Sequence, residues 1–402
     1  MMQLREWNAR LHGLVIFRTL LEDPVLAKLL NLTDRMEAGG RGVGPVCDAV
    51  AQFEAALFER TTNWGTYLST TVLETETVCV RQAAAGTLPP VLQTALDNEL
   101  AFLQQLCSLT LDELLDAAGA ADKLPFLPRW ETKAIDLHAA YAQRMSEVGK
   151  KGYGMFARHH VFTVENGQLV PVRYPDPQRL DELPGYEQER EKVIANTRAL
   201  LAGMPANNVL LYGDAGTGKS STVKAIANEF AADGLRLVEV KKNQLYQIPD
   251  LMDKLAANPL KFILFIDDLA FDQDDNTYSI MKTILEGGLE RRPANVAIYA
   301  TSNRRHLVRQ SFSDRAGDEV DAFETISEKT ALAERFGLRI PYLTMSKADY
   351  LALVDHLAAR AGVAMSAELL HAQAMTWEIR HAGRTPRTAQ QFIASLSLQE
   401  KQ

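Results

Sequence analysis

The sequence predicts an α/β protein, in which a parallel sheet flanked by helices follows an all-helical N-terminal domain and precedes a small helical lid. Two patterns carry this prediction. In the middle of the chain, short apolar runs alternate with helical segments, as they do in parallel sheets with crossover helices. On either side, apolar residues recur three and four positions apart, which is typical of amphipathic helices. We expect domains at residues 1–150, 151–179, 180–343 and 344–402.

Length and composition limit the class of protein. The chain has 402 residues, of which 47% are hydrophobic, so it can bury the cores of two or three domains. Its net charge of -8 argues against a surface that binds nucleic acid without specificity, and nucleic acid is not an expected partner. The longest apolar runs are too short for a secretory signal or a membrane span, so we expect a cytoplasmic protein without a membrane contact.

The cysteines agree with a reducing compartment. Cys47, Cys79 and Cys107 are the three cysteines of the chain, and their spacing is irregular. An odd number without a C-x-x-C pair fits neither a disulfide framework nor a zinc site. We therefore expect reduced, buried thiols.

The N-terminal domain, residues 1–150, has a helical pattern. Segments such as GPVCDAVAQFEAALFER and PVLQTALDNELAFLQQLC place apolar residues three and four apart, and EAGGRGVGP and GTLPP interrupt them. These repeats predict a helical bundle.

A hairpin is expected at the junction between the domains, within residues 151–179. Two β-rich runs in HVFTVENGQLVPVRY flank Asn166-Gly167, which is a strong hairpin signal. The preceding basic stretch, GKKGYGMFARHH, places Tyr153 and Phe156 between cations. It is the local candidate for contact with a single nucleic-acid strand, and it equally fits a domain junction.

Five strands and three lid helices are expected after the hairpin. The strand-like runs between residues 180 and 343 are NVLLYG, LRLVEV, KFILFID, VAIYATS and LRIPYL. The amphipathic pieces of residues 344–402 are KADYLALVDHLAARAG, SAELLHAQAMTWEIRHAG and RTPRTAQQFIASL. The first group predicts the sheet, and the second predicts the helical lid.

The stretch GDAGTGKSS, between the first of these strands and a predicted helix, matches the P-loop (Walker A) pattern in full. Its glycines let backbone N–H groups turn toward phosphates, and the helix presents its positive N-terminus to them. Lys219 would reach the β- and γ-phosphates, and the Ser220 hydroxyl would bind Mg²⁺. The alternative is a glycine turn that only caps a helix. The expected ATP- or ADP-binding residues are Gly213, Asp214, Ala215, Gly216, Thr217, Gly218, Lys219, Ser220 and Ser221.

Two carboxylates end the apolar run FILFIDD, as in a Walker B element. A strand buried on both faces carries carboxylates only where the sheet edge opens onto a ligand. Asp267 would hold Mg²⁺ through water, and Asp268 would orient or deprotonate the attacking water. Asp268 could instead cap the turn or helix that follows. The nearby Asp272, Asp274 and Asp275 fit a solvated loop or a helix cap.

The order of the remaining motifs resembles the AAA+ ATPase superfamily over about residues 180–396. IYATSN resembles sensor 1 with Asn303, LAERFGLRI resembles the box VII segment with Arg335 as arginine finger, and GRTPRTAQQF resembles sensor 2 with Arg387. LDELPGYEQEREKVIANTRALL resembles the segment that packs beside adenine, which makes Tyr186 a candidate nucleotide contact. In the order of its motifs, the chain most resembles replication initiators and helicase loaders. It also resembles a bacterial family of single-module AAA+ ATPases with an N-terminal helical extension.

The resemblance implies a role for each of these residues. Asn303 would hydrogen-bond the attacking water or the γ-phosphate, or it would cap a loop. Arg335 would reach the γ-phosphate of a neighbouring subunit, which requires a homo-oligomer, as a ring or a nucleotide-dependent assembly. The alternative for Arg335 is a surface ion pair with a carboxylate such as Glu334 or Glu328.

Two lid arginines compete for the sensor 2 role. Arg384 lies three residues before Arg387 and could take the same role. Pro386 fits the first turn of a helix and places Arg387 near its start, so we prefer Arg387.

The sequence departs from the commonest AAA+ pattern at two positions. Asp268 stands where many members have Glu, although initiator-like members also carry two aspartates here. In VKKNQLYQIPDL, Tyr246 occupies the pore-loop region without a following glycine. Processive protein unfolding is therefore not expected.

One segment, residues 304–329, is not explained by a nucleotide site. A basic cluster of Arg304, Arg305 and His306 precedes an acidic stretch, between the sensor 1 and box VII motifs. It fits a solvated loop with local ion pairs, or a nucleotide-responsive loop that contacts a partner.

Two functions remain open on the sequence. The first is an ATP hydrolase that couples turnover to remodelling of an unidentified protein partner, held by the N-terminal helical domain. The second is an ATP-dependent switch or loader with slow turnover, acting on a component of DNA replication or repair. A remodelling ATPase needs both Arg335 and Asp268, whereas a switch could bind nucleotide without either.

Overall fold

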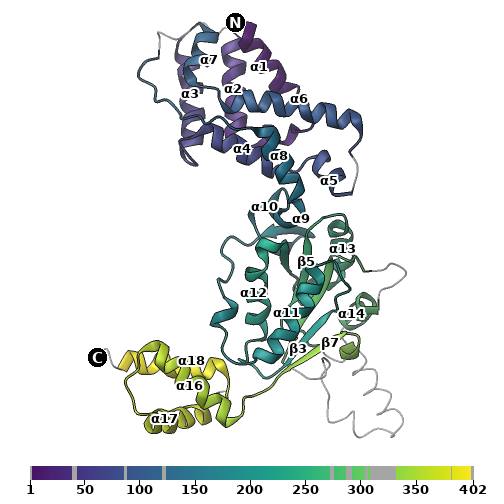
Figure 1. The fold of residues 1–402 in the computed structure, drawn as a ribbon, viewed down its shortest axis with the longest axis vertical. Coiled ribbons are helices and arrows are strands. Elements are labelled where there is room, and N and C mark those ends of the chain that lie inside the picture. The colour runs from purple at the N-terminus through teal and green to yellow at the C-terminus, as the bar shows by residue number, and fades with distance from the viewer. Residues whose placement is uncertain are drawn as a thin grey trace. The chain divides into compact units, whose positions relative to one another are not determined.

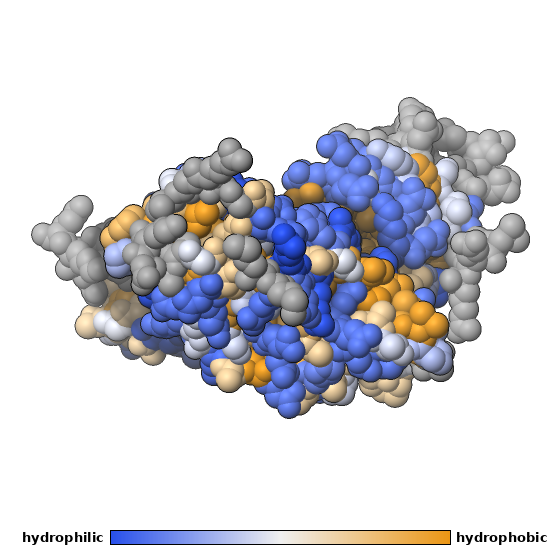
Figure 2. All heavy atoms as spheres, turned by 90° about the horizontal axis from the view of Figure 1, so that it is seen from above, coloured by the Kyte–Doolittle hydropathy of each residue, from blue (hydrophilic) through white to orange (hydrophobic). Residues whose placement is uncertain are grey.

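The computed structural model describes residues 2–38, 43–85, 88–119, 124–271, 276–286, 292–303, 307, 332–381 and 383–399. The chain divides into two compact units, Met1–Arg158 and His159–Gln402 (Figure 1). Figure 2 shows a face on which hydrophilic residues predominate and hydrophobic residues lie in small groups. Within the described ranges, the structure has no helix that is both long and apolar enough to cross a membrane.

The first unit is built from helices around one apolar core. Phe53 contacts the rings of Trp64 and Trp130 edge to face, at centroid distances of 5.3 and 4.9 Å. The indole N–H groups of Trp64 and Trp130 donate to the carbonyls of Leu106 and Leu109, so these buried donors are satisfied. The helices are α1 (Met2–His12), α2 (Pro24–Glu37), α3 (Val43–Phe58), α4 (Trp64–Glu74), α5 (Val78–Ala85), α6 (Pro90–Cys107), α7 (Leu111–Ala118), α8 (Leu137–Ser146), α9 (Val148–Lys151) and α10 (Met155–Arg158).

Local signals explain where several of these helices begin. Asp23 accepts hydrogen bonds from the N–H groups of Val25 and Leu26, and a proline follows it at the first position of α2. Thr110 and Glu113 form a reciprocal capping box at the start of α7. Such caps stabilise helix termini by about 1 kcal/mol each.

The basic stretch before the hairpin does not offer its aromatic rings to a ligand. Tyr153 is 6% exposed and Phe156 is 7% exposed. Stacking on nucleic-acid bases requires an accessible ring face. The hypothesis of a single-strand contact through these two rings is therefore wrong, because both rings are used in packing.

The second unit contains a seven-stranded sheet with the order β2-β1-β4-β5-β6-β3-β7. Its strands are β1 (Val161–Glu165), β2 (Gln168–Pro171), β3 (Val209–Gly213), β4 (Leu235–Glu239), β5 (Lys261–Ile266), β6 (Val296–Ser302) and β7 (Leu338–Tyr342). β1 and β2 pair antiparallel, and the other neighbours pair parallel. The predicted α/β fold, with its five parallel strands, is confirmed.

The hairpin signal is also confirmed, and the hairpin belongs to the sheet. Glu165 pairs with Gln168, and Asn166 and Gly167 have φ values of 50° and 74°. β1 pairs in parallel with β4, with Val161 opposite Leu237. The hairpin therefore extends the edge of the sheet.

Helices pack on the sheet and carry residues toward its carboxyl edge. α11 and α12 cover one face, where strand residues such as Val209, Leu211 and Ile263 alternate with residues of the other face (Figure 1). The carboxyl ends of β3, β5 and β6 meet at one edge, which is where open α/β sheets bind ligands. The helices that flank the sheet are α11 (Glu187–Leu201), α12 (Lys219–Glu229), α13 (Ile248–Ala256) and α14 (Asn276–Glu286).

Three helices form the lid: α16 (Lys347–Ala361), α17 (Ala367–Arg380) and α18 (Pro386–Gln399). Tyr350, Val354, Ala374 and Phe392 lie in their shared core. Ser346 caps α16 by accepting from the N–H of Asp349. The predicted helical lid is confirmed.

Candidate nucleotide-binding site

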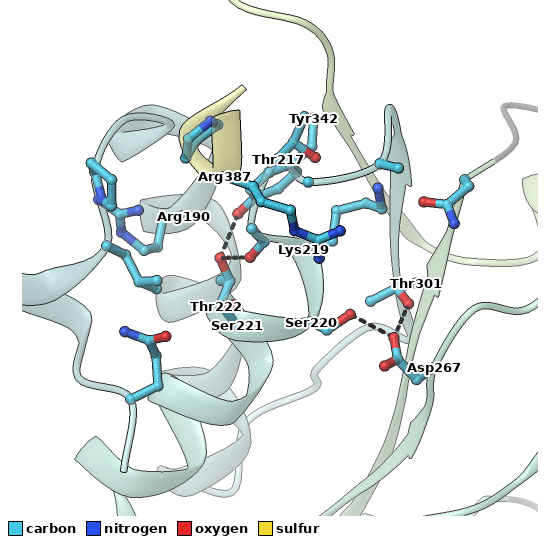
Figure 3. A pocket seen from close by; sticks show the side chains of 18 of the residues that line it. Arg190, Thr217, Lys219, Ser220, Ser221, Thr222, Asp267, Thr301, Tyr342 and Arg387 are labelled. Atoms are coloured by element: carbon cyan, nitrogen blue, oxygen red, sulfur yellow. Dashed lines mark hydrogen bonds between the residues drawn. The ribbon is translucent and has the colours of Figure 1, made fainter. Parts of the chain in front are cut away.

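A cavity of about 310 Å³ lies at the carboxyl edge of the sheet. It is lined by the P-loop, the ends of β5, β6 and β7, the segment before α11, and the start of α18. In the view of Figure 3, Arg190 lies at the opposite end of the cavity from Asp267 and Thr301, and Lys219 and Arg387 lie between them. The lining residues are Gln178, Leu183, Pro184, Arg190, Ala215, Gly216, Thr217, Gly218, Lys219, Ser220, Ser221, Thr222, Asp267, Asp268, Thr301, Asn303, Tyr342, Pro386, Arg387 and Gln390.

Glycines allow the P-loop to pass close to its neighbours. At Gly213, φ is 136°, and a Cβ atom would lie 2.2 Å from the carbonyl oxygen of Tyr342. At Gly216, φ is 81°, and a Cβ atom would lie 3.1 Å from the hydroxyl of Thr385 in the lid. A side chain at either position would collide with the adjacent chain or require a backbone conformation that L-residues rarely adopt.

Lys219 is a buried cation held by neutral groups. It is 6% exposed, and its Nζ donates to the carbonyl oxygens of Gly213 and Asp214, at 3.0 and 2.6 Å. Burial lowers the pKa of Lys219, and the nearby Asp214, Asp268 and Asp267 oppose this shift. Among the described residues, no carboxylate forms an ion pair with its Nζ. A buried ammonium without a directly paired anion fits a bound polyphosphate, so the loop fits a nucleotide.

Asp267 accepts two hydroxyl hydrogen bonds on one oxygen. Its Oδ1 accepts from Ser220 Oγ at 2.6 Å and from Thr301 Oγ1 at 2.5 Å (Figure 3). The P-loop hydroxyl and the β5 carboxylate therefore lie together at the phosphate end of the cavity. Hydroxyl and carboxylate oxygens are the ligands that Mg²⁺ prefers, so these residues fit the metal.

Asp268 is held in a strained turn over the same edge. Its φ of 51° is uncommon for a residue with a side chain, although aspartate tolerates this region better than most. Its N–H donates to Thr301 Oγ1 at 2.9 Å, and its Oδ1 accepts from Asn303 Nδ2 at 2.9 Å. The two residues predicted to act on the attacking water therefore contact each other.

Thr301 is a site residue that the sequence motifs missed. It is 1% exposed, and its hydroxyl bonds both Asp267 and the N–H of Asp268. Alternation along β6 was the available signal, because residues two apart in a strand share a face and Asn303 follows two positions later.

The lid contributes Arg387 to the cavity, and Arg384 does not line it. The N–H of Arg387 donates to the carbonyl of Gly216 at 3.3 Å, which brings the start of α18 against the P-loop. The carbonyl of Arg384 instead accepts from the N–H of Met345 within the lid. The placement of the two side chains favours Arg387 for contact with a nucleotide.

Tyr186 lines an adjoining cavity of about 780 Å³, whereas Tyr342 lines the cavity at the P-loop. The two rings stack at a centroid distance of 4.9 Å and an angle of 26°. The Tyr186 hydroxyl donates to the carbonyl of Leu343 at 2.5 Å. Arg190, one helical turn after Tyr186, is 8% exposed and does line the cavity. Leu183, Pro184 and Arg190 bring this segment to the cavity, and packing decides which of its side chains face inward.

Arg335 lies outside the cavity, paired with an acid that the sequence did not suggest. Its Nε donates to Glu286 Oε1 at 2.8 Å, and its Nη2 contacts the same oxygen. Its side chain is 25% exposed. The paired carboxylate belongs to the end of α14, whereas Glu334 was one of the expected partners. Arg335 therefore does not line the cavity of its own chain in this conformation.

The other residues named in the sequence analysis lie away from the cavity or outside the described residues. Tyr246 is 63% exposed, and its hydroxyl accepts from the side-chain amide of Gln247. The three cysteines are free, and Cys79 and Cys107 are buried. The expectation of a buried thiol is wrong for Cys47, which is half-buried. Asp272, Asp274, Asp275, Glu328 and the segment 304–329, apart from Leu307, lie outside the described residues.

The sequence matches a family over most of its second unit. A family model described as "Protein of unknown function (DUF815)" matches residues 156–400. The chain belongs to the DUF815 family. Among curated proteins, the DUF815 chain is similar to AAA-ATPase At4g30250 of Arabidopsis thaliana, with 26% identity over 148 residues. That match covers 34% of this chain and 26% of the plant protein.

Solved structures give a more distant likeness. The Thermotoga maritima RuvB Holliday junction branch migration motor is 18% identical, with a TM-score of 0.36, over 54% of the DUF815 chain and 63% of that chain. A variant of the same motor is 17% identical, with a TM-score of 0.36, over 55% and 65% of the two chains. The DUF815 chain thus spans less than two thirds of these structures and about a quarter of the plant protein.

The P-loop geometry and the sequence matches agree on the superfamily. The DUF815 chain combines a complete P-loop with a neighbouring pair of strand-end carboxylates and an asparagine at the end of β6. It is similar to a curated AAA-ATPase over 148 residues. The chain is a member of the AAA+ ATPase superfamily.

Proposed function

We propose that this protein is a Mg²⁺-dependent ATP hydrolase, which couples turnover to a conformational change in an unidentified protein partner. The observation that carries the proposal is the buried Lys219 ammonium, which donates to two backbone carbonyls, beside hydroxyl and carboxylate oxygens that fit a metal. The N-terminal helical domain, residues 1–150, is the proposed partner-binding domain. In this proposal, residues 151–179 form the hairpin junction, residues 180–343 form the nucleotide-binding α/β domain, and residues 344–402 form the helical lid.

Different groups of the chain would bind the phosphates and the metal. Backbone N–H groups of the P-loop and the start of α12 would hold the phosphates, with Lys219 and Arg387 supplying positive charge. Ser220 and Asp267 would hold Mg²⁺, either directly or through water. When bound, the metal neutralises phosphate charge that develops during transfer.

Asp268 and Asn303 would act on the attacking water. The amide of Asn303 donates to Asp268 Oδ1, which fixes the direction of that carboxylate. The carboxylate would accept a proton or orient the water toward the γ-phosphate. Asp268 is shorter than glutamate by one methylene, and its left-handed backbone turns it over the cavity. This geometry supports a catalytic role for Asp268, at a position where many AAA+ members have Glu.

Arg335 would serve a neighbouring subunit. Its place outside its own cavity supports action across an interface, because the guanidinium does not line that cavity and is paired with Glu286. A homo-oligomer is therefore part of the proposal. Assembly would bring Arg335 to the phosphates of the adjacent subunit.

The test is phosphate release by the Asp268→Asn chain. We expect binding of a non-hydrolysable ATP analogue to persist and turnover to fall at least about 100-fold, because the asparagine cannot accept a proton. Asp253→Asn, on the exposed face of α13, is the matched control and should turn over normally. Turnover with Mg²⁺ should also exceed turnover in a chelator. An unchanged rate in Asp268→Asn would move the catalytic role to another residue.

A second function is supported by the contact between Arg335 and Glu286. In one chain the finger is engaged by its own carboxylate, which fits an ATP-dependent switch or loader with slow turnover until a partner or neighbour releases it. Glu286→Gln removes the negative charge and keeps the shape of the side chain. If the ion pair restrains the finger, this variant should turn over ATP several-fold faster than the wild type at equal subunit concentration. Equal rates would exclude the ion pair as the restraint.

A further inference from the structure

Asp214, the second residue of the P-loop, contacts the segment that connects the sheet to the lid. Its Oδ2 accepts from the N–H of Thr344 at 2.7 Å and from the Thr344 hydroxyl at 2.6 Å. Thr344 lies between the end of β7 and the start of α16. The P-loop therefore holds the connecting segment through a carboxylate.

The same residue also holds the phosphate-binding lysine. The carbonyl of Asp214 accepts from Lys219 Nζ at 2.6 Å, and its N–H donates to the carbonyl of Tyr342 at 3.1 Å. One residue thus bonds Lys219 through its backbone and Thr344 through its side chain. A change at Lys219 can reach Thr344 through a single amino acid.

The carboxylate of Asp214 is suited to a strong contact. The Thr344 hydroxyl and the Thr344 N–H lower the pKa of Asp214, and Lys219 contributes to the same direction. The group is therefore ionised at neutral pH, and hydrogen bonds to an ionised acceptor are stronger than neutral ones.

A second, separate contact joins the lid to the P-loop. The N–H of Arg387 donates to the carbonyl of Gly216, and a Cβ atom at Gly216 would lie 3.2 Å from Arg387 Cβ. The lid therefore touches the P-loop at Thr344, before α16, and at Arg387, in α18. Two separate contact points restrict the rotation of the lid more than one contact point would.

We propose that Asp214 is a positioning residue that couples the state of Lys219 to the orientation of the lid. The inference rests on the proposed function, because it requires that Lys219 exchange its bonds to the Gly213 and Asp214 carbonyls for bonds to phosphate. That exchange removes one of the contacts of Asp214 and shifts the carboxylate that holds Thr344. The lid then adopts a different orientation in the nucleotide-bound chain.

The experiment measures the distance between the lid and the sheet. Two exposed alanines, Ala195 in α11 and Ala372 in α17, are replaced by cysteine and spin-labelled. The partly exposed Cys47 is changed to serine, so that it does not take up label. Distance distributions are recorded by pulsed electron paramagnetic resonance, without nucleotide and with a non-hydrolysable ATP analogue. The full-length chain is used throughout.

Thr344→Val is the main variant, because valine keeps the shape of threonine and lacks the hydroxyl. We expect its affinity for the analogue to change less than about threefold. Its distance distribution should broaden and shift less with the analogue, because only the backbone N–H of residue 344 still donates to Asp214. Thr344→Ser keeps the hydroxyl and should behave as the wild type. Asp214→Asn should also broaden the distribution, which tests the same contact from the other side.

The outcomes separate this inference from the proposed function. If the wild type binds the analogue and both Thr344→Val and Asp214→Asn shift like Thr344→Ser, the coupling through Asp214 is overturned while the nucleotide site stands. A wild-type lid that does not respond to bound analogue has the same consequence. If the wild type fails to bind the analogue in calorimetry, the proposed function is overturned instead. The broadening without nucleotide then decides whether Asp214 holds the lid.

Discussion

Each unit buries an ionisable side chain, and the two side chains differ in their hydrogen bonds and in the charges around them. Glu54 in α3 is 2% exposed, and neither of its carboxylate oxygens has a hydrogen-bond partner among the described residues. Lys219 is 6% exposed, and its ammonium donates to two carbonyls and lies near three carboxylates. The first charge lies in a helical core, and the second lines a cavity.

The difference shows how a buried charge can be neutralised. Burial raises the pKa of Glu54 to about 7, and Arg129 only partly opposes this, so a proton removes much of its charge near neutral pH. The carboxylates around Lys219 act against neutralisation of the lysine. A cation that is kept charged beside an open cavity is a site for an anion, whereas a carboxyl that can take up a proton affects mainly stability.

The largest expected effect is at Lys219. Lys219→Ala should weaken ATP binding by about 1000-fold or more, because the phosphates lose a buried cation. The same substitution should not lower the melting temperature of the nucleotide-free chain, because it removes an incompletely compensated charge. Calorimetry and thermal unfolding measure the two effects, with the exposed Lys192→Ala as control. Retained micromolar binding would contradict the P-loop assignment.

Arg335 adds a third case, in which a carboxylate of the same chain compensates the charge. Arg335→Ala should lower turnover by about 100-fold and leave nucleotide binding within a few-fold of the wild type, because it lies outside its own cavity. Mixing Arg335→Ala with Asp268→Asn subunits should restore some turnover, since one kind of mixed interface has both groups intact. Absence of rescue, with mixed assembly confirmed by mass, would argue against a shared site.

The smallest effect concerns Glu54 and depends on pH. The folded-state pKa lies above that of an unfolded glutamate, so the unfolded chain loses its proton first as pH rises above about 4.5. The free energy of unfolding of the helical unit should therefore fall between about pH 4.5 and 7, by roughly 1.4 kcal/mol per pH unit, and level off above that.

Glu54→Gln should remove this slope. At pH 8 the variant should be more stable than the wild type by on the order of 3 kcal/mol, and near pH 4 the two should be similar. Urea unfolding of the full chain, followed by tryptophan fluorescence, measures the difference. Glu59→Gln, at an exposed position of the same unit, should keep the wild-type slope. A wild-type slope in Glu54→Gln would assign the pH dependence to another group.

Local patterns were sufficient for much of the fold and for the phosphate end of the site. The P-loop, Asp267, Asp268 and Asn303 lie next to strands with clear apolar runs, and parallel strands bring their carboxyl ends to one edge. Their proximity follows from that topology.

Contacts set by long-range packing were not predictable. Tyr186 and Tyr342 are far apart in the chain, and only the folded structure shows that they stack and that Tyr342 lines the cavity. The ion pair of Arg335 with Glu286 depends on where α14 ends in space. The pairing of β1 with β4 likewise joins segments that no local pattern connects.

The most direct test of the account is ATP turnover per subunit as a function of protein concentration. The mass of the assembly is recorded in parallel, in ADP and in a non-hydrolysable ATP analogue. A Mg²⁺-dependent ATPase whose finger acts across an interface should show a rate per subunit that rises with concentration as the analogue favours a larger assembly. Tight nucleotide binding with negligible turnover and an unchanged mass would contradict it.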